Sequence, residues 1–157
     1  MGLYQHRKVR NQRRDFLHKE SRKIVDQYGL IVFEELQPAN MSKRPQPKQD
    51  ENGAYMPNGA AAKGGLNKSI LDAGWAEFVS LCTYKAECAS RTLLTVNPRY
   101  TSQICPGCGA VKKKTLDERR HECPCGTSLD RDHASAIIIL RLGRSQQSAM
   151  AVEAPCL

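Results

Sequence analysis

The chain has 157 residues, about the length of one domain. It carries 24 Lys and Arg against 16 Asp and Glu, a formal net charge of +8, and 40% of its residues are hydrophobic. The longest apolar run, Ala136 to Leu140, is far shorter than the roughly 20 residues of a membrane span, and the N-terminal residues lack the apolar core of a signal peptide. We therefore expect neither a membrane protein nor a secreted one.

A basic amphipathic helix is predicted over residues 3–28, which contain no Pro and no Gly and are followed by Gly29 as a C-cap. Its apolar residues recur at helical spacing. Eight cations gather between Arg7 and Lys23: Arg7, Lys8, Arg10, Arg13, Arg14, Lys19, Arg22 and Lys23. Such a face is either simply solvated or a nucleic-acid contact, and the excess positive charge of the whole chain favours the latter.

The next element predicted is a strand over residues 30–36, whose continuous apolar start is typical of a parallel strand buried on both faces. Glu34 and Glu35 close it. A carboxylate at this place is costly to bury unless it faces a metal ion, a partner or water. Ligands also bind at the C-terminal ends of parallel strands. Either the strand ends at the surface here, or Glu34 belongs to a site.

Residues 37–69 are rich in Pro, Gly, Asn, Gln and Lys, and we predict a flexible loop. Ser69 is a candidate N-cap for a helix over residues 70–88, with Trp75 and Phe78 in the core and Cys82 and Cys88 as small buried apolar residues. A strand over residues 92–97 ends at Asn97-Pro98. This alternation of helices and strands predicts an α/β fold.

The strongest chemical signal is two cysteine pairs, Cys105-Pro106-Gly107-Cys108 and Cys123-Pro124-Cys125, which are separated by 14 residues. Two Gly-containing knuckles that face each other would supply four thiolates for a tetrahedral Zn²⁺. A redox pair and chance are the alternatives. The second pair is C-x-C instead of C-x-x-C, so His121 is a possible substitute ligand. Between the pairs lie Lys112, Lys113, Lys114, Arg119 and Arg120.

Asp130-Arg131-Asp132 precedes an apolar helix that we expect to end at Gly143. The two aspartates would either cap this helix or serve a site. Residues 144–157, with the seventh cysteine at Cys156, are predicted to be a disordered tail.

Several blocks follow one another in a characteristic order: Gln12 to Lys19, the strand that ends in Glu34, Asn67 to Asp72, Tyr84-Lys85-Ala86, Asn97 to Gln103, the cysteine pairs and Asp130-Arg131-Asp132. This series resembles the C-terminal part of TnpB (OrfB) proteins, which are transposon-encoded, RNA-guided nucleases. The resemblance runs from Arg7 to about Gly143.

The resemblance implies an incomplete RNase H-like (RuvC) domain that lacks its first strands and carries an inserted zinc ribbon. Its parts would be a RuvC-like segment over residues 1–100, the ribbon over 101–128, the last RuvC motif with its helix over 129–143, and the tail over 144–157. The family's first catalytic carboxylate lies upstream of the basic helix, so we expect it to be missing. Two asparagines usual after the third carboxylate are replaced by Ala134 and Ile138.

By position in the resemblance, Glu34 and Asp132 match the second and third carboxylates, which hold Mg²⁺ when the site is complete, and Arg119 matches an arginine near the scissile phosphate. Cys105, Cys108, Cys123 and Cys125 match the zinc ligands. The expected nucleic-acid contacts are Arg7, Lys8, Arg10, Arg13, Arg14, Lys19, Lys112, Lys113 and Lys114. The implied partners are DNA, guide RNA and a separately encoded N-terminal portion, with no membrane, and the implied location is the prokaryotic cytoplasm at the nucleoid.

Loss of one carboxylate of a two-metal site costs about 10³-fold or more in rate. We therefore expect these residues to bind DNA and zinc without cleaving when alone. Two alternatives remain: the C-terminal half of a split, Mg²⁺-dependent endonuclease, and a repurposed zinc-ribbon regulator that binds DNA.

Overall fold

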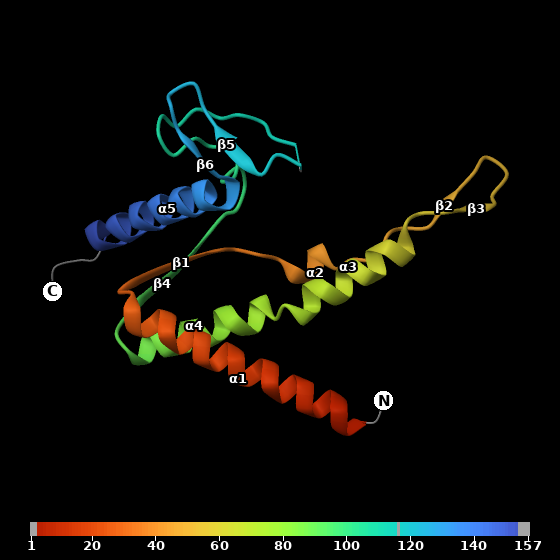
Figure 1. Cartoon of the computed structure of the whole chain (residues 1–157), viewed down its shortest axis with the longest axis horizontal. Coiled ribbons are helices and arrows are strands. Elements are labelled where there is room, and N and C mark those ends of the chain that lie inside the picture. The colour runs from red at the N-terminus through yellow and green to blue at the C-terminus, as the bar shows by residue number, and fades with distance from the viewer. Residues whose placement is uncertain (1–2, 116, 154–157) are drawn as a thin grey trace. The chain divides into compact units, whose positions relative to one another are not determined.

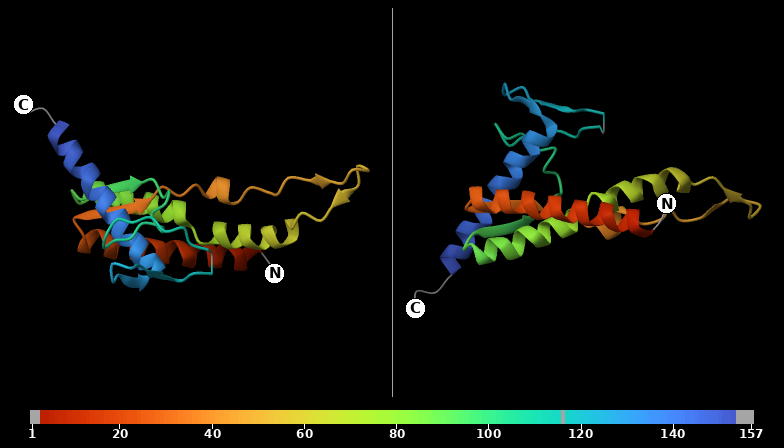
Figure 2. Two further views of the ribbon diagram at one scale, coloured as in Figure 1. Left: turned by 90° about the horizontal axis from the view of Figure 1, so that it is seen from above. Right: turned by 60° about the horizontal axis from the view of Figure 1, so that its bottom comes forward.

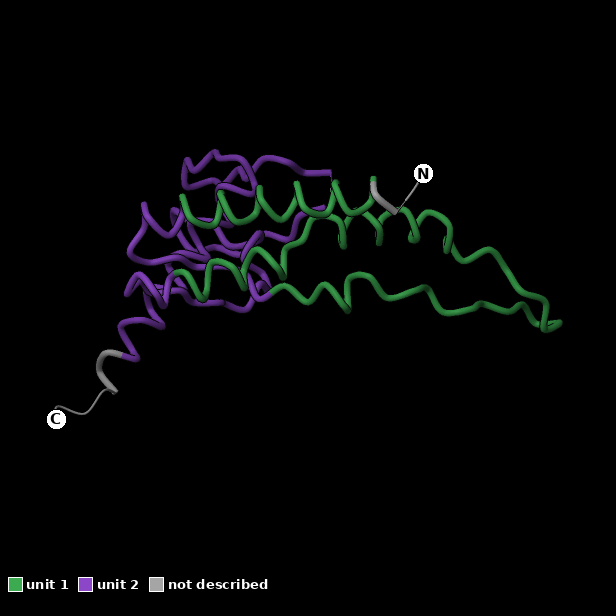
Figure 3. Tube along the Cα trace, turned by 90° about the horizontal axis from the view of Figure 1, so that it is seen from below, with its two compact units in different colours: residues 1–23, 36–85 green, residues 24–35, 86–157 purple. Residues whose placement is uncertain are grey.

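The computed structural model describes residues 3–115 and 117–153. The chain forms two compact units, residues 1–23 with 36–85 and residues 24–35 with 86–157 (Figure 3). Helix α1 (Leu3–Gln27) begins in the first unit and ends in the second. Cys156 lies outside the described residues, and in the described part of the chain no helix is long and apolar enough to cross a membrane.

The first unit also contains α2 (Pro38–Met41), the short strands β2 (Lys48–Gln49) and β3 (Tyr55–Met56), α3 (Ala60–Asp72) and most of α4 (Trp75–Cys88) (Figure 1). Strands β2 and β3 pair antiparallel. Asp50 closes their turn by accepting hydrogen bonds from the N–H groups of Asn52 and Ala54.

A buried lysine ties α4 to α1 within this unit. The Lys85 ammonium, in a side chain that is 7% exposed, donates to the Ser21 hydroxyl at 2.8 Å and to the His18 carbonyl at 2.6 Å. Ser21 is itself wholly buried. Burying an ammonium is tolerable only when its donors are satisfied, so this polar contact fixes which faces of the two helices meet.

The second unit is built on a parallel pair of strands, β1 (Leu30–Glu34) and β4 (Thr92–Val96), in the register Leu30 to Thr92 through Glu34 to Val96. Ile31 and Phe33 pack on one face, against Val25 of α1 and Ala86 of α4. Helix α5 (Arg131–Glu153) packs on β1 and β4 (Figure 2). Strand side chains alternate between faces, so Glu34 shares the face of Val32, which contacts α5.

Several sequence predictions need correction in the segment between the strands. Residues 37–69 are not a continuous loop, because α3 already begins at Ala60 behind Gly59, whose φ is +71°. Ser69 is therefore inside a helix instead of capping one, and its hydroxyl bonds to the Gly65 carbonyl. The helix predicted over residues 70–88 is broken at Gly74, where φ is +65°.

Burial also differs from the prediction at two side chains of α4. Trp75 is 39% exposed and so is not core. Of the two cysteines expected to be buried, Cys82 is, whereas Cys88 is exposed.

The C-terminal segment is helical to Glu153, so the predicted disordered tail from residue 144 is wrong for the described residues. Gly143 does not end the helix. A Cβ at this position would lie 2.7 Å from Val32 Cγ1 and 3.1 Å from Val32 Cβ. The glycine is required for close approach of α5 to β1, and the Gln, Ser and Ala that follow it are compatible with a helix.

Candidate functional site

Four cysteine sulfurs converge in the second unit. The Sγ atoms of Cys105, Cys108, Cys123 and Cys125 all lie within 4.8 Å of one another. Cys105 and Cys125 are 3.6 Å apart, as are Cys108 and Cys123. Two tight turns present them, each completed by a glycine with positive φ, Gly109 at +77° and Gly126 at +89°. The C-x-C pair thus delivers both of its sulfurs, and the group is complete without His121.

The sulfur spacing fits a tetrahedral metal ion. Zinc–sulfur bonds of about 2.3 Å place neighbouring sulfurs of a tetrahedron about 3.8 Å apart, close to the two 3.6 Å separations. Close packing of the two knuckles depends on Gly107, because a Cβ there would collide with the Thr127 hydroxyl and lie 3.2 Å from Cys125 Sγ. The cluster can hold a metal ion.

The thiols are electrostatically unequal. The pKa of Cys105 is lowered to about 5, first by the Cys108 N–H and also by His121 and the Gly107 N–H. The Thr127 hydroxyl and N–H lower the pKa of Cys125. The Cys125 N–H favours the thiolate of Cys123, but hydrogen bonds to the other sulfurs, together with burial, outweigh it and raise the pKa of Cys123 to about 12. A bound dication would remove this competition by taking the place of the shared protons.

The ribbon that carries the cysteines is attached to the start of α5. Strands β5 (Arg120–Glu122) and β6 (Ser128–Asp130) pair antiparallel, and β6 leads directly into the helix. The Arg131 N–H donates to the Arg119 carbonyl at 2.8 Å, and Arg141 donates to the Pro106 carbonyl of the first knuckle. The metal cluster and the N-terminus of α5 therefore belong to one packed region.

Glu34, at the end of β1, lies within range of the charge of Asp132, in the first turn of α5, although the two are far apart in sequence. Burial raises the pKa of Glu34, and the negative charge of Asp132 raises it further. Asp130 caps the helix by accepting the Asp132 N–H at 2.9 Å, which leaves the Asp132 carboxylate 86% exposed in the first turn. The sequence left capping and a site role open for these aspartates, and Asp130 is the one that caps the helix.

The other residues that the sequence singled out near this site differ in their exposure and contacts. Arg119 is exposed, and its main-chain carbonyl accepts the Arg131 N–H at the start of α5. The Glu35 N–H continues the strand ladder by donating to the Val96 carbonyl at 2.8 Å. Ala134 and Ile138, which replace the asparagines expected from the family, are buried in the packed face of α5.

The predicted nucleic-acid contacts fall into two groups. Arg7, Lys8, Arg10, Lys112 and Lys113 are exposed. The others have partners: Arg13 pairs with Asp72 at 2.8 Å, Arg14 with Glu77 at 3.5 Å, Lys19 with Asp15 at 2.6 Å, and Lys114 donates to the Ser102 carbonyl at 2.8 Å. Exposed ion pairs are worth at most about 1 kcal/mol, so a phosphate can compete for these arginines and for Lys19. Burial lowers the pKa of Lys114.

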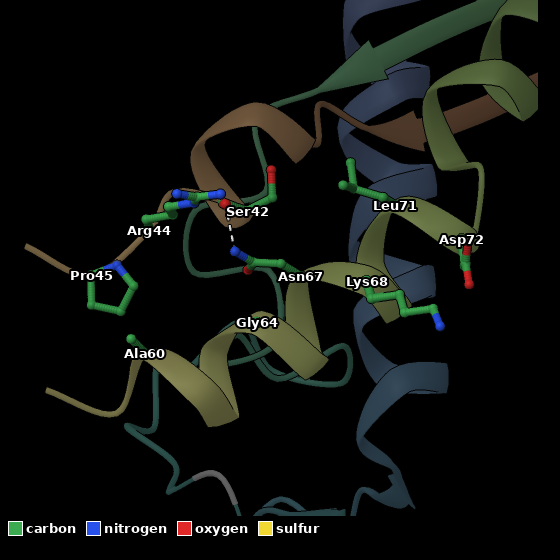
Figure 4. A pocket seen from close by; sticks show the side chains of 9 residues that line it. All are labelled: Ser42, Arg44, Pro45, Ala60, Gly64, Asn67, Lys68, Leu71 and Asp72. Carbon is green, nitrogen blue, oxygen red and sulfur yellow. Dashed lines mark hydrogen bonds between the residues drawn. The ribbon is translucent and has the colours of Figure 1, made fainter. Parts of the chain in front are cut away.

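The first unit adds a hollow that the sequence did not indicate. It has a volume of about 740 Å³ and lies between α3 and the segment after α2 (Figure 4). Arg44 and Lys68 give it two cations, and Asn67 closes one wall by donating to the Ser42 carbonyl at 2.7 Å. None of the site residues predicted from sequence lines it. The only sequence signal was the presence of cations in a segment expected to be a loop.

Known proteins share much of this sequence. A family model described as "Cas12f1-like, TNB domain" matches residues 75–139, which include all four cysteines and Asp132. The chain is 37% identical over 119 residues to "Putative RNA-guided DNA endonuclease InsQ" of Escherichia coli strain K12, a match that covers 75% of this chain and 29% of that protein. A "Putative RNA-guided DNA endonuclease" of Streptomyces pristinaespiralis is 31% identical over 140 residues, covering 88% of this chain and 30% of that protein.

Among solved structures, the "Cryo-EM structure of the Cas12f1-sgRNA-target DNA complex" matches with a TM-score of 0.55 and 17% identity, covering 85% of this chain and 35% of that one. At this identity the match shows a common fold. The chain spans less than a third of the length of the two curated relatives.

Proposed function

Because the chain is TnpB-like, we propose that its 157 residues supply two carboxylates and the zinc ribbon of a RuvC-type nuclease of RNase H-like fold, and that by themselves they bind nucleic acid without cutting it. The observation that carries this proposal is that Glu34 lies within range of the charge of Asp132. Glu34 ends a parallel strand, Asp132 lies in the first turn of a helix about a hundred residues later, and the Asp132 charge makes ionisation of Glu34 less favourable.

Two carboxylates held in this way are suited to a divalent cation. The exposed Asp132 carboxylate and the partly buried Glu34 carboxylate offer hard oxygen ligands of the kind that Mg²⁺ prefers. Bound Mg²⁺ would supply activation of water and stabilisation of the leaving oxygen during phosphodiester hydrolysis. Within the chain, Asp130 orients the helix end that carries Asp132, and the β1–β4 ladder positions Glu34. Arg119, whose main-chain carbonyl accepts the Arg131 N–H at the start of α5, is the cation that we propose for a phosphate.

Two carboxylates are too few for the full reaction. A two-metal site depends on its bridging ligands, and loss of one removes about 4 kcal/mol or more of transition-state stabilisation, about 10³-fold in rate. We therefore assign these residues binding alone. The exposed cations of α1 and of the ribbon, with Arg44 and Lys68 in the hollow of the first unit, supply the attraction for DNA or guide RNA.

Zinc is the proposed ion of the cysteine cluster, since a four-thiolate tetrahedral set favours Zn²⁺ over Mg²⁺ or Ca²⁺. Its role is structural. The ion holds the two turns of the ribbon together, and the ribbon in turn contacts α5 at its start through the Arg131 N–H and further along the helix through Arg141.

A test combines binding and cleavage on the full chain. Fluorescence anisotropy of a labelled DNA duplex should show binding that weakens steeply between about 50 and 200 mM salt. The same samples with Mg²⁺ at about 5–10 mM should show no cleavage. Cleavage that disappears in Glu34→Gln would overturn the assignment of binding alone. Absence of salt-sensitive binding would overturn the proposal as a whole.

One observation favours the split endonuclease as a second candidate. Among the described residues, β1 hydrogen-bonds to β4 alone, so the other edge of the strand that carries Glu34 is open to pairing. A separately supplied portion that added strands and a third carboxylate at this edge would complete the site. That candidate predicts Mg²⁺-dependent cleavage upon mixing, which Glu34→Gln and Asp132→Asn both abolish.

A further inference from the structure

The loop between β4 and the first cysteine knuckle holds a tyrosine in an unusual backbone conformation. Tyr100 has a φ of +67°, and the residue is 50% exposed. A positive φ is strained for a residue with a bulky side chain, whereas Gly or Asn adopts it readily. Because the residue is half exposed, burial of apolar surface does not account for a tyrosine here. Strain of this kind is concentrated at functional sites.

Hydrogen bonds on both sides of Tyr100 enforce the conformation of the loop. The Asn97 side-chain oxygen accepts the Arg99 N–H at 2.9 Å, and the Tyr100 carbonyl accepts the Gln103 N–H at 2.8 Å. The Gln103 carbonyl in turn accepts the Lys112 N–H at 2.9 Å, which attaches the loop to the ribbon. The tyrosine is therefore held in a fixed place while its side chain faces solvent.

This loop is anchored to both elements that carry the carboxylates of the proposed nuclease site. Val96, which ends β4 four residues before the tyrosine, is the register partner of Glu34. Thr101, directly after the tyrosine, is buried, and its hydroxyl accepts a hydrogen bond from Ser135 at 3.2 Å. Ser135 lies about one helical turn after Asp132 in α5. A DNA strand that reached the two carboxylates would therefore pass close to this loop.

Arg99 gives the tyrosine a cationic backing. Its guanidinium lies 5.0 Å from the centroid of the Tyr100 ring, and the arginine is exposed. Aromatic side chains stack on the bases of single-stranded nucleic acid, and arginine adds cation–π attraction and charge for the phosphates. In a duplex the faces of the bases are already stacked on one another. The pair of side chains therefore suits an unpaired nucleotide.

We propose that Arg99 and Tyr100 form a stacking platform that positions one unpaired nucleotide of the DNA strand entering the carboxylate site. The base stacks on the ring face that Arg99 does not cover, and the guanidinium offsets the charge of a neighbouring phosphate. This rests on the proposed nuclease function. Tyr100 is then a positioning residue with no part in the chemical step, and the strained backbone serves to direct its ring toward the substrate.

Opposite effects on stability and binding test the proposal in the full, zinc-loaded chain. Tyr100→Asn removes the ring and supplies a residue that tolerates a positive φ, so the Tm should not fall. Its affinity for a labelled single-stranded DNA should fall about 5–150-fold, the range for loss of one stacked base. Tyr100→Phe keeps the ring and should bind like the wild type. Tyr28→Asn, at an exposed tyrosine before the opposite end of β1, is the matched control and should leave the affinity unchanged. An unchanged affinity in Tyr100→Asn would overturn the proposal.

An abasic oligonucleotide separates stacking from attraction to the backbone. It keeps every phosphate, so the wild type should bind it about 5–150-fold more weakly than the ordinary single strand, whereas Tyr100→Asn should bind the two alike. Equal losses for both oligonucleotides in Tyr100→Asn would overturn the platform, as would binding of duplex DNA without binding of single strands. Absence of salt-sensitive binding to any DNA in the wild type would instead refute the proposed function.

Discussion

Substitution of Gly143 by Ala tests whether α5 is held against β1 as the structure describes. In an isolated helix the change would stabilise by about 1 kcal/mol, because glycine is a poor helix former. Here the added Cβ would lie 2.7 Å from Val32 Cγ1 and 3.1 Å from Val32 Cβ, against ordinary carbon contacts of about 3.5–4.0 Å. Rotation of the valine cannot relieve a collision that includes its own Cβ.

The helix must therefore move away from the strand by most of 1 Å. Overpacking of this kind costs about 1–3 kcal/mol, so after subtraction of the gain in helix propensity we expect Gly143→Ala to destabilise by about 1 kcal/mol. For a chain of this size that is a fall of about 2–4 °C in Tm.

A double-mutant cycle isolates the contact between Gly143 and Val32. Val32→Ala removes both methyl groups that collide and leaves the tight 3.1 Å contact with the Cβ, so in that background Gly143→Ala should be about 1 kcal/mol less destabilising than in the wild type. The assay is urea unfolding of the metal-loaded chain, followed by far-UV circular dichroism. If Gly143→Ala changes the free energy of unfolding by the same amount in both backgrounds, the close approach of α5 to β1 is refuted.

Three further predictions concern the site. Cys105→Ser should reduce bound zinc from one ion per chain to none and lower the Tm. Cys88→Ser, at an exposed cysteine outside the cluster, is the control and should change neither. One bound zinc and an unchanged Tm in Cys105→Ser would contradict the four-cysteine site. Burial and Asp132 raise the pKa of Glu34, so the charge of Glu34 opposes folding at neutral pH. Glu34→Gln should therefore have a higher Tm than the wild type at pH 7, and this difference in Tm should vanish as the pH falls through the raised pKa. A difference that does not depend on pH, or an equal difference in Glu35→Gln, would argue against the carboxylate pair. Replacement of Arg7, Lys8 and Arg10 by Gln should reduce the slope of log K for DNA binding against log salt concentration by about 2–3. Arg91→Gln, at an exposed arginine, is the control and should leave the slope nearly unchanged. An unaltered slope in the triple variant would exclude these α1 cations from the DNA-binding surface.

The sequence predicted those elements whose local signals agree with their packing. The continuous apolar run before Glu34 indicated a parallel strand, and the structure pairs it with the strand from Thr92 in that sense. The spacing of the cysteines indicated a common cluster, because two short turns fix where their sulfurs point whatever surrounds them.

Tertiary packing explains the predictions that were wrong. Gly143 resembles a helix stop in sequence, but its lack of a Cβ serves the contact with Val32, which no local pattern could reveal. Ser69 resembles an N-cap, yet the helix begins nine residues earlier, at Ala60. The contact of Lys85 with Ser21 joins residues that are distant in the chain, so no local pattern could reveal it.

The central claim, that Glu34 and Asp132 belong to a metal-dependent nuclease site, is tested most directly in a chimera. These 157 residues would replace the matching part of the E. coli relative, and Mg²⁺-dependent, RNA-guided DNA cleavage would be measured beside the unaltered relative. Our account predicts cleavage by the chimera that falls about 10³-fold or more in Glu34→Gln and in Asp132→Asn. Cleavage that survives either substitution, or a folded, zinc-loaded chimera that is inactive where the relative is active, would contradict it.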